Sequence, residues 1–234
     1  MNKIINKDIS NFFDFKKPAI SNAFNFSIYT GWNSLVVIKF NLEKDKNLTS
    51  DFIKLKFPEI YDKEKILVVA KGTLKISLRK KHFLLKEFDA LNFFSDEYKI
   101  ECKKDTIAYL VSAKNLTAYN KDSIFFNFKN DIEIKNLWGG QCISRVYAGE
   151  NLNLVMFDLK PGFEFNDKGH SNEQITWVIE GEMNFYANKI KKKLNQFNGV
   201  DIGKNHEHGG VSNGAIGFDV FYPKREEKKY NKNI

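Results

Sequence analysis

The prediction of the fold is based on the stretch GFEFNDKGHSNEQITWVIEG, residues 162–181. A glycine stands at each end, and the polar residues Lys168, His170 and Gln174 lie between them. Successive side chains of a β-strand point to opposite faces. These even-numbered residues, together with Thr176, are therefore predicted to point into the interior of one β-barrel.

An internal repeat at an offset of 109 residues extends this pattern to the first half of the chain. The segment Val69–Val111 aligns without a gap on Val178–Val220, with Gly72 opposite Gly181. Both copies have short apolar segments separated by polar turns, and 3.6-residue periodicity is scarce. The predicted fold class is all-β, with two jelly-roll barrels in tandem.

The repeat also predicts how the chain is divided. The predicted segments are an N-terminal segment at 1–21, a degenerate barrel at 22–117, a connection at 118–136, a barrel with the ligand pocket at 137–225, and a basic tail at 226–234. The connection is rich in aromatic residues rather than in Gly and Ser. It is predicted to be a strand packed across both barrels rather than a flexible linker.

The glycine and ligand spacing resembles the first motif of the cupin superfamily, in which His-x-His stands where Lys168 and His170 stand here. The segments HGGVSN at 208–213 and DVFYPKRE at 219–226 resemble the small pectin-degradation cupins, which linearise unsaturated uronates. The two-barrel layout with its NEQI signature is similar to the bicupin isomerase of bacilysin biosynthesis. The resemblance implies cupin barrels, that is, double-stranded β-helices.

By position, the resemblance implies that His170, Gln174 and His208 are metal ligands. Imidazole and oxygen donors suit a divalent transition metal such as Fe, Ni, Mn, Co or Zn. None of the three ligands carries a charge, and a protonated Lys168 would repel a cation, so the metal is expected to bind less tightly than to a full four-ligand set, and a site without metal is the alternative. Three further residues are candidates for the missing donor: His206, Glu164 and Asp167.

Other side chains are predicted to contact a small-molecule substrate. Lys168 is expected to bind an anionic group or, if burial lowers its pKa, to shuttle a proton. Tyr186 is expected to donate or accept a proton, although its position equally suits a core or rim aromatic residue. Arg145 is expected to bind a carboxylate, although a surface ion pair is the alternative. Thr176 is expected to line the pocket beside them.

In the first half, the same offset puts four residues at the ligand positions: Glu59, Tyr61, Lys65 and Lys99. Two lysines would oppose a bound cation, so the first barrel is predicted to be a scaffold without metal. An anion site built on Lys65 and Lys99 is the alternative.

Composition limits the class of partner. The net charge is +8, but the lysines are scattered and five positive charges lie in the tail Lys224–Lys232, so nucleic-acid binding is not expected. No run of 18 apolar residues exists, and no membrane span is predicted. Cys102 and Cys142 lie in different halves, which favours a cytoplasmic protein without a disulfide framework.

The sequence therefore predicts a metal-dependent isomerase or lyase that acts by proton transfer on a small carboxylated metabolite. A sugar acid or uronate is the first substrate expected, from the resemblance alone. The alternatives are a cupin that binds a sugar or small acid without catalysis, and a metal-dependent dioxygenase. A homodimer is expected from cupins generally and from Trp177, which is predicted to lie on an outward face.

Overall fold

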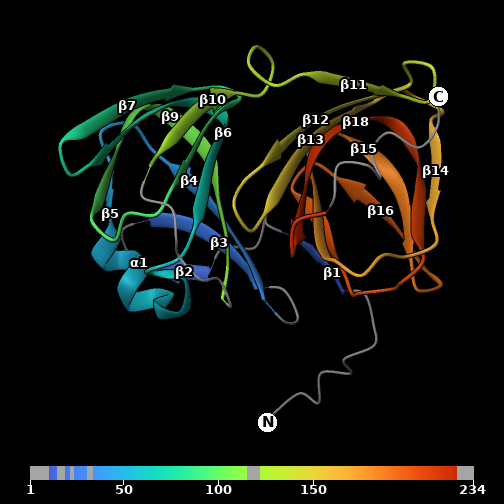
Figure 1. Cartoon of the computed structure of the whole chain (residues 1–234), viewed down its shortest axis with the longest axis horizontal. Helices are drawn as coiled ribbons and strands as arrows, with labels where there is room; N and C mark the ends of the chain where they lie inside the picture. The colour runs from blue at the N-terminus through green and yellow to red at the C-terminus, as the bar shows by residue number, and fades with distance from the viewer. Residues whose placement is uncertain (1–10, 15–18, 22–23, 31–33, 115–121, 226–234) are drawn as a thin grey trace, which may run out of the picture.

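The computed structural model describes residues 11–14, 19–21, 24–30, 34–114 and 122–225. These residues form two antiparallel sheets of nine strands each, which lie side by side (Figure 1). Several strands, such as Leu35–Leu42 and Asn153–Leu159, are buried almost throughout, because their two faces pack in different apolar clusters. The predicted all-β class is confirmed.

The first sheet has the strand order β10-β8-β6-β9-β4-β3-β2, and β5 and β7 pair with β9 and β6. Its strands are β2 (Ala19–Ser21), β3 (Phe24–Thr30), β4 (Leu35–Leu42), β5 (Asn47–Thr49), β6 (Lys65–Leu78), β7 (Lys81–Lys86), β8 (Asp89–Phe93), β9 (Tyr98–Ala113) and β10 (Ile124–Asn127). The short helix α1 (Ser50–Lys56) and the 3₁₀ turn η1 (Pro58–Ile60) lie between β5 and β6.

The second sheet has the order β1-β17-β15-β18-β13-β12-β11, and β14 and β16 pair with β18 and β15. Its strands are β1 (Asn11–Asp14), β11 (Ile134–Leu137), β12 (Cys142–Ala148), β13 (Asn153–Leu159), β14 (Glu164–Asp167), β15 (Glu173–Ala187), β16 (Ile190–Asn195), β17 (Asn198–Ile202) and β18 (His208–Tyr222). The two sheets have the same strand order. At the 109-residue offset, β6, β8 and β9 of the first sheet correspond to β15, β17 and β18 of the second.

The two halves exchange their edge strands. In chain order, β1 precedes the strands of the first sheet, yet it pairs with β17 of the second sheet. Strand β10 precedes β11 of the second sheet, yet it pairs with β8 of the first sheet. The predicted connection 118–136 is therefore shared, because β10 and β11 belong to different sheets. The predicted domain boundaries stay a prediction.

One apolar core joins the two halves. Tyr109 of β9 packs in it on Trp177 of β15, at a ring-centroid distance of 5.3 Å. The ring centroid of Phe218, the repeat partner of Tyr109, lies 5.5 Å from that of Trp177. Trp177 is fully buried in this core, so its outward face packs on the other sheet of the same chain. The homodimer stays a prediction that Trp177 does not support.

Two buried carboxylates hold the halves together at the edge of this core. Glu173, the first residue of β15, accepts hydrogen bonds from the backbone amides of Ser34 and Leu35 at 3.0 and 3.2 Å. Glu64, its partner at the 109-residue offset, accepts hydrogen bonds from the amides of Glu150 and Asn151 at 3.0 and 2.9 Å. Each glutamate therefore binds the start of a strand in the opposite half, β4 in one case and β13 in the other.

Figure 1 places the N-terminal strand β1 beside the second half, although the rest of the early chain builds the first half. Among the described residues, no helix has the length and hydrophobicity needed to cross a bilayer.

We expect Glu64→Gln and Glu173→Gln each to lower the free energy of unfolding by about 2–4 kcal/mol, because each removes a buried charge from several hydrogen bonds. Urea unfolding followed by tryptophan fluorescence measures the effect. Glu97→Gln, at an exposed position, is the matched control and should lie close to the wild type. A loss no larger than that of the control would contradict the structural role of the two carboxylates.

Candidate functional site

A cavity of about 290 Å³ lies inside the second half. Most of its wall is apolar, and a few polar side chains reach into it. It is lined by Trp138, Cys142, Ser144, Val155, Phe157, Leu159, Phe163, Phe165, Asn166, Asp167, Gln174, Thr176, Met183, Phe185, His208, Asp219, Phe221 and Arg225. A concave apolar site with a few polar groups is the usual form of a small-molecule site.

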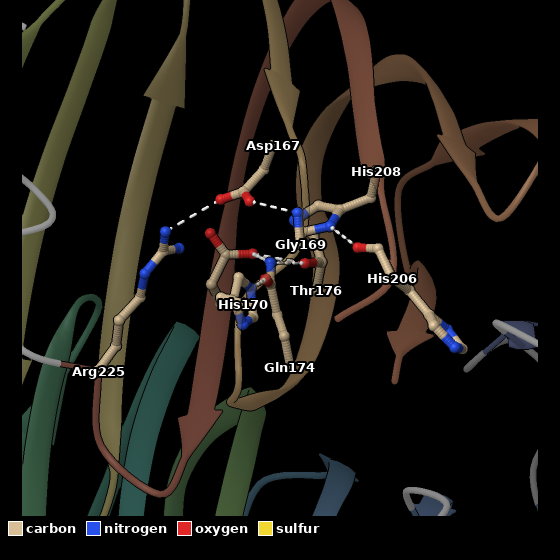
Figure 2. A network of polar contacts seen from close by, with 9 residues as sticks. Asp167, Gly169, His170, Gln174, Thr176, His206, His208 and Arg225 are labelled. Atoms are coloured by element: carbon tan, nitrogen blue, oxygen red, sulfur yellow. Dashed lines mark hydrogen bonds and ion pairs between the residues drawn. The ribbon is translucent and has the colours of Figure 1, made fainter. Parts of the chain in front are cut away.

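Three potential metal ligands lie close together beside this cavity, and two of them, Asp167 and His208, are in its wall. Asp167, His170 and His208 each offer a donor atom, and these atoms lie within 4.8 Å of one another. Asp167 ends β14 and His208 begins β18, and the pairing of these strands places the two residues directly opposite each other. His170 comes from the turn between β14 and β15 (Figure 2). Among the described residues, no other group of His, Cys, Asp and Glu is arranged in this way.

Hydrogen bonds orient two of these ligands. The Nδ1 of His208 lies 2.9 Å from the backbone oxygen of His206, and because that oxygen only accepts, Nδ1 carries the proton and Nε2 keeps its lone pair. The Gly169 amide donates to Oδ1 of Asp167 at 2.9 Å. Gly169 has a φ of +105°, and a Cβ there would lie 2.7 Å from the backbone of Asn205, so only glycine fits this turn.

The third ligand, His170, belongs to a hydrogen-bonded chain. Its Nε2 lies 2.9 Å from Oε1 of Gln174, whose amide nitrogen donates to Thr176 Oγ1 and Asp219 Oδ1 at 2.8 and 3.1 Å. The glutamine oxygen is thus the acceptor, and Nε2 of His170 is the donor. Its Nδ1 is then left with a lone pair, buried and without a hydrogen-bond partner among the described residues. Such an orphaned buried nitrogen fits a site that takes up a metal.

The protonation states also suit metal binding. Burial lowers the pKa of His170 to about 4, and the positive charge of Arg225 acts in the same direction. Burial likewise lowers the pKa of His208. Although burial raises the pKa of Asp167, the Gly169 amide and Arg225 together lower it more. At pH 7 the cluster therefore offers two neutral imidazoles and one carboxylate, the forms in which these groups bind metals.

Asp219 was not predicted as a site residue. It lines the cavity on β18 and accepts a hydrogen bond from Thr176 Oγ1 at 2.6 Å. Burial raises its pKa to about 6, although the hydrogen bonds from Thr176 and Gln174 oppose the shift. The repeat contained a signal for this residue, because the 109-residue offset aligns it with Leu110, which is buried in the apolar core of the first half. A carboxylate in place of a core leucine indicates a function other than packing.

Arg225 is the guanidinium that reaches the cavity. Its Nη2 lies 3.0 Å from Oδ2 of Asp167, and only 17% of its side chain is exposed. The sequence suggested Arg145 for this role. Arg145 is absent from the cavity wall because it alternates along β12 with Cys142 and Ser144, which do line the cavity.

The predicted place of Lys168 in the barrel interior is wrong. Its side chain is 80% exposed, and its Nζ binds Glu207 at 2.8 Å. The hydrogen bond to Glu207 raises the pKa of Lys168, contrary to the neutral lysine considered from the sequence. The alternation argument failed here because β14 ends at Asp167, so Lys168 lies in a turn rather than in a strand.

Tyr186 also lies outside the cavity, in a shallow depression beside Lys191 and Lys192. Two irregularities in the pairing of β15 with β18, at Val178/Glu180 and Gly181/Met183, change which residues point inward. Thr176 faces the cavity before these bulges, and odd-numbered Met183 and Phe185 face it after them.

His206 contributes its backbone oxygen rather than its ring. Figure 2 shows the ring pointing away from the other two histidines, and it is not part of the ligand cluster. Glu164, another candidate for the missing donor, is exposed and lines the outer depression near Tyr186. Of the three candidate donors named from the sequence, Asp167 is the one that lies in the cluster. Gln174 and Thr176 both reach the cavity as expected.

The equivalent position in the first half is filled by an ammonium group. Lys65, aligned with Gln174 by the offset, is fully buried, and its Nζ donates to the backbone oxygens of Tyr61 and Lys63. Burial lowers its pKa to about 8, although the carboxylates of Asp96 and Asp62 oppose the shift.

Comparisons with solved structures find the same fold at low sequence identity. Protein Ylba from E. coli matches with a TM-score of 0.73 at 12% identity, over 97% of this chain and 96% of that one. A cupin 2 conserved barrel domain protein from Leptotrichia buccalis matches with 0.63 at 14%, over 91% and 96%. Oxalate decarboxylase from Lactobacillus farciminis, in a formate complex, matches with 0.69 at 11%, over 93% and 88%. No protein-family model and no curated protein sequence matches.

The metal cluster predicts which substitutions remove metal. We expect Asp167→Asn and His208→Ala each to reduce metal content at least tenfold, because each removes one of only three clustered donors. Elemental analysis of protein purified from metal-supplemented cultures measures this. Lys168→Ala is the matched control and should keep the wild-type content, because Lys168 points to solvent. Equal metal content in all four proteins would show that the metal lies elsewhere.

Lys65 predicts a pH dependence of stability. Its pKa is about 8 in the folded chain and near 10.5 when unfolded, so between these values the unfolded state binds more protons. Relative to Lys65→Met, the wild type should therefore gain stability as pH rises from about 8 to about 10.5. Urea unfolding at pH 7.5 and pH 10 measures the difference, and Lys75→Met, at a partly exposed position of the same strand, is the control. A constant difference across this range would contradict the lowered pKa.

Proposed function

We propose, from the premise that this chain has the cupin fold, that its second half binds a divalent transition metal and acts on a small carboxylated metabolite. The reaction proposed is a proton transfer, of the isomerase or lyase type. The observation that carries the proposal is the meeting of Asp167, His170 and His208 beside a largely apolar cavity, with Asp167 and His208 in its wall.

The donor set supports a transition metal. Two imidazoles and a carboxylate suit Fe, Ni, Mn, Co or Zn, and Asp167 brings the negative charge that the histidines and Gln174 lack. Gln174 lies beside His170, and its Oε1 accepts the hydrogen bond from Nε2 that leaves Nδ1 of His170 available to a metal. When bound, the metal would polarise a carbonyl or carboxylate oxygen of the substrate.

The residues of the cavity supply the rest of the chemistry. Asp219 faces the cavity, and a carboxyl group with a pKa of about 6 can take up and release a proton near neutral pH. Thr176 and Gln174 hold it in place through hydrogen bonds. The aromatic walls exclude water from the reacting atoms, which strengthens electrostatic interactions there. We assign the proton transfer to Asp219, in place of Lys168 and Tyr186.

A second candidate function is binding of a small acid without catalysis. The ion pair between Arg225 and Asp167 favours it, because this pair already gives the carboxylate of Asp167 a cationic partner. In that case the cavity would hold a ligand but make no use of Asp219.

An isotope-exchange experiment separates the two functions. We expect the metal-loaded protein to catalyse exchange of a carbon-bound hydrogen for deuterium in at least one acid of a panel of uronates, hydroxy acids and keto acids, followed by proton NMR. Asp219→Asn should slow this exchange at least 100-fold, because the amide cannot accept the proton. Metal content should stay at the wild-type level.

Asp158→Asn is the matched control, because Asp158 lies on the neighbouring strand β13 between two lining residues and is absent from the cavity wall. It should exchange at the wild-type rate. Equal rates in the wild type and Asp219→Asn would remove Asp219 from the mechanism. Binding of an acid without exchange in any member of the panel would favour the second function.

A further inference from the structure

The charges in the cavity wall show what kind of ligand the cavity can take. Two acidic side chains, Asp167 and Asp219, face it, and among the described residues Arg225 is the one arginine or lysine in its wall. Acidic side chains therefore outnumber basic ones in this part of the metal-free wall, and a bound dication would reverse that balance. An anion is repelled in the first state and attracted in the second.

Arg225 and the metal ligands share Asp167. Its Oδ2 lies 3.0 Å from the guanidinium, and its donor atom lies within 4.8 Å of those of His170 and His208. A cation bound in the cluster would therefore be separated from Arg225 by the carboxylate of Asp167 alone. Two positive groups at this separation repel each other, and a negative group bound near both relieves the repulsion.

We infer that a divalent metal and a monocarboxylic acid bind this cavity cooperatively, and that Arg225 binds the carboxylate of the acid. The inference rests on the proposed metal centre and adds the class of ligand and the residue that recognises it. A guanidinium suits this role because its planar fork matches a carboxylate. By thermodynamic linkage, the acid must raise the affinity for the metal by the same factor as the metal raises the affinity for the acid.

The rest of the wall selects an acid with an apolar body. Away from the polar cluster the cavity presents aromatic and aliphatic side chains, among them Trp138, Phe157 and Phe163. The hydroxyls of a sugar acid would lose hydrogen bonds to water against these rings, which weakens binding. Ser144 is the exception, since its Oγ is buried without a hydrogen-bond partner among the described residues and its side chain lines the cavity. The wall thus fits an apolar acid with one polar substituent better than a uronate.

Calorimetry with Zn²⁺ and phenylacetate tests this inference. Zn²⁺ is titrated into metal-free full-length protein with and without phenylacetate, and phenylacetate is titrated with and without Zn²⁺. We expect each ligand to tighten the binding of the other at least tenfold and by the same factor. Glucuronate, which has a carboxylate on a polar body, and 2-phenylethanol, which has the same ring without a charge, should each bind at least tenfold more weakly than phenylacetate to the Zn²⁺-loaded protein.

Substitution of Arg225 assigns the carboxylate contact. Arg225→Met should bind Zn²⁺ at least as tightly as the wild type, because it removes a positive charge, but should bind phenylacetate at least tenfold more weakly. Arg225→Lys should recover part of this loss and controls for folding, together with circular dichroism. Arg145→Met, which removes the arginine outside the cavity, is the matched control and should keep both affinities.

The outcomes separate the inference from the proposed function. If Zn²⁺ binds the wild type no more tightly than it binds His208→Ala, the metal centre itself is wrong, and the inference fails with it. If Zn²⁺ binds the cluster but phenylacetate leaves its affinity unchanged, the metal centre stands and the cooperative binding is overturned. Wild-type phenylacetate affinity in Arg225→Met would overturn the role of Arg225, and glucuronate binding as tight as that of phenylacetate would overturn the apolar ligand class.

Discussion

The architecture depends on how the two repeats hold each other. Each half contributes an edge strand to the sheet of the other, β1 in one direction and β10 in the other. Each half also places a buried glutamate on the backbone amides at the start of a strand in the other half. Because Glu173 directly precedes Gln174, its contact with the first half holds the start of the strand that carries Gln174 and Thr176. The scaffold half therefore takes part in positioning the site.

The two halves share a topology but differ in what fills their interiors. At one equivalent position the first half buries Lys65, whose ammonium is held by backbone oxygens, and the second half presents Gln174 to a cavity. At another, Leu110 packs in the core of the first half, whereas Asp219 faces the cavity of the second. The side chains at equivalent positions thus differ between a half with a filled interior and a half with a cavity, while the strand order is the same.

The polar groups of the site work as two linked sets. In one, Arg225 and the Gly169 amide hold Asp167 as a carboxylate close to two neutral histidines. In the other, Gln174 connects His170 to Thr176 and Asp219, where burial favours a carboxyl group that titrates near pH 6. One set is suited to bind cations and anions, and the other to move a proton. Their separation within one cavity is the basis of the function proposed.

The sequence by itself determined the all-β class and the repeat, and it singled out Gln174, Thr176 and His208, which line the cavity, and His170, which lies beside them, because motif spacing is a local property. Only the tertiary structure decided the roles of Asp167, Arg225 and Asp219 and removed Lys168, Tyr186 and Arg145 from the site. The end of β14 turns Lys168 to solvent, and the bulges in β15 reverse the alternation before Tyr186 is reached. Such breaks in register arise from pairing with strands that are distant in the sequence, and spacing along the chain does not encode them.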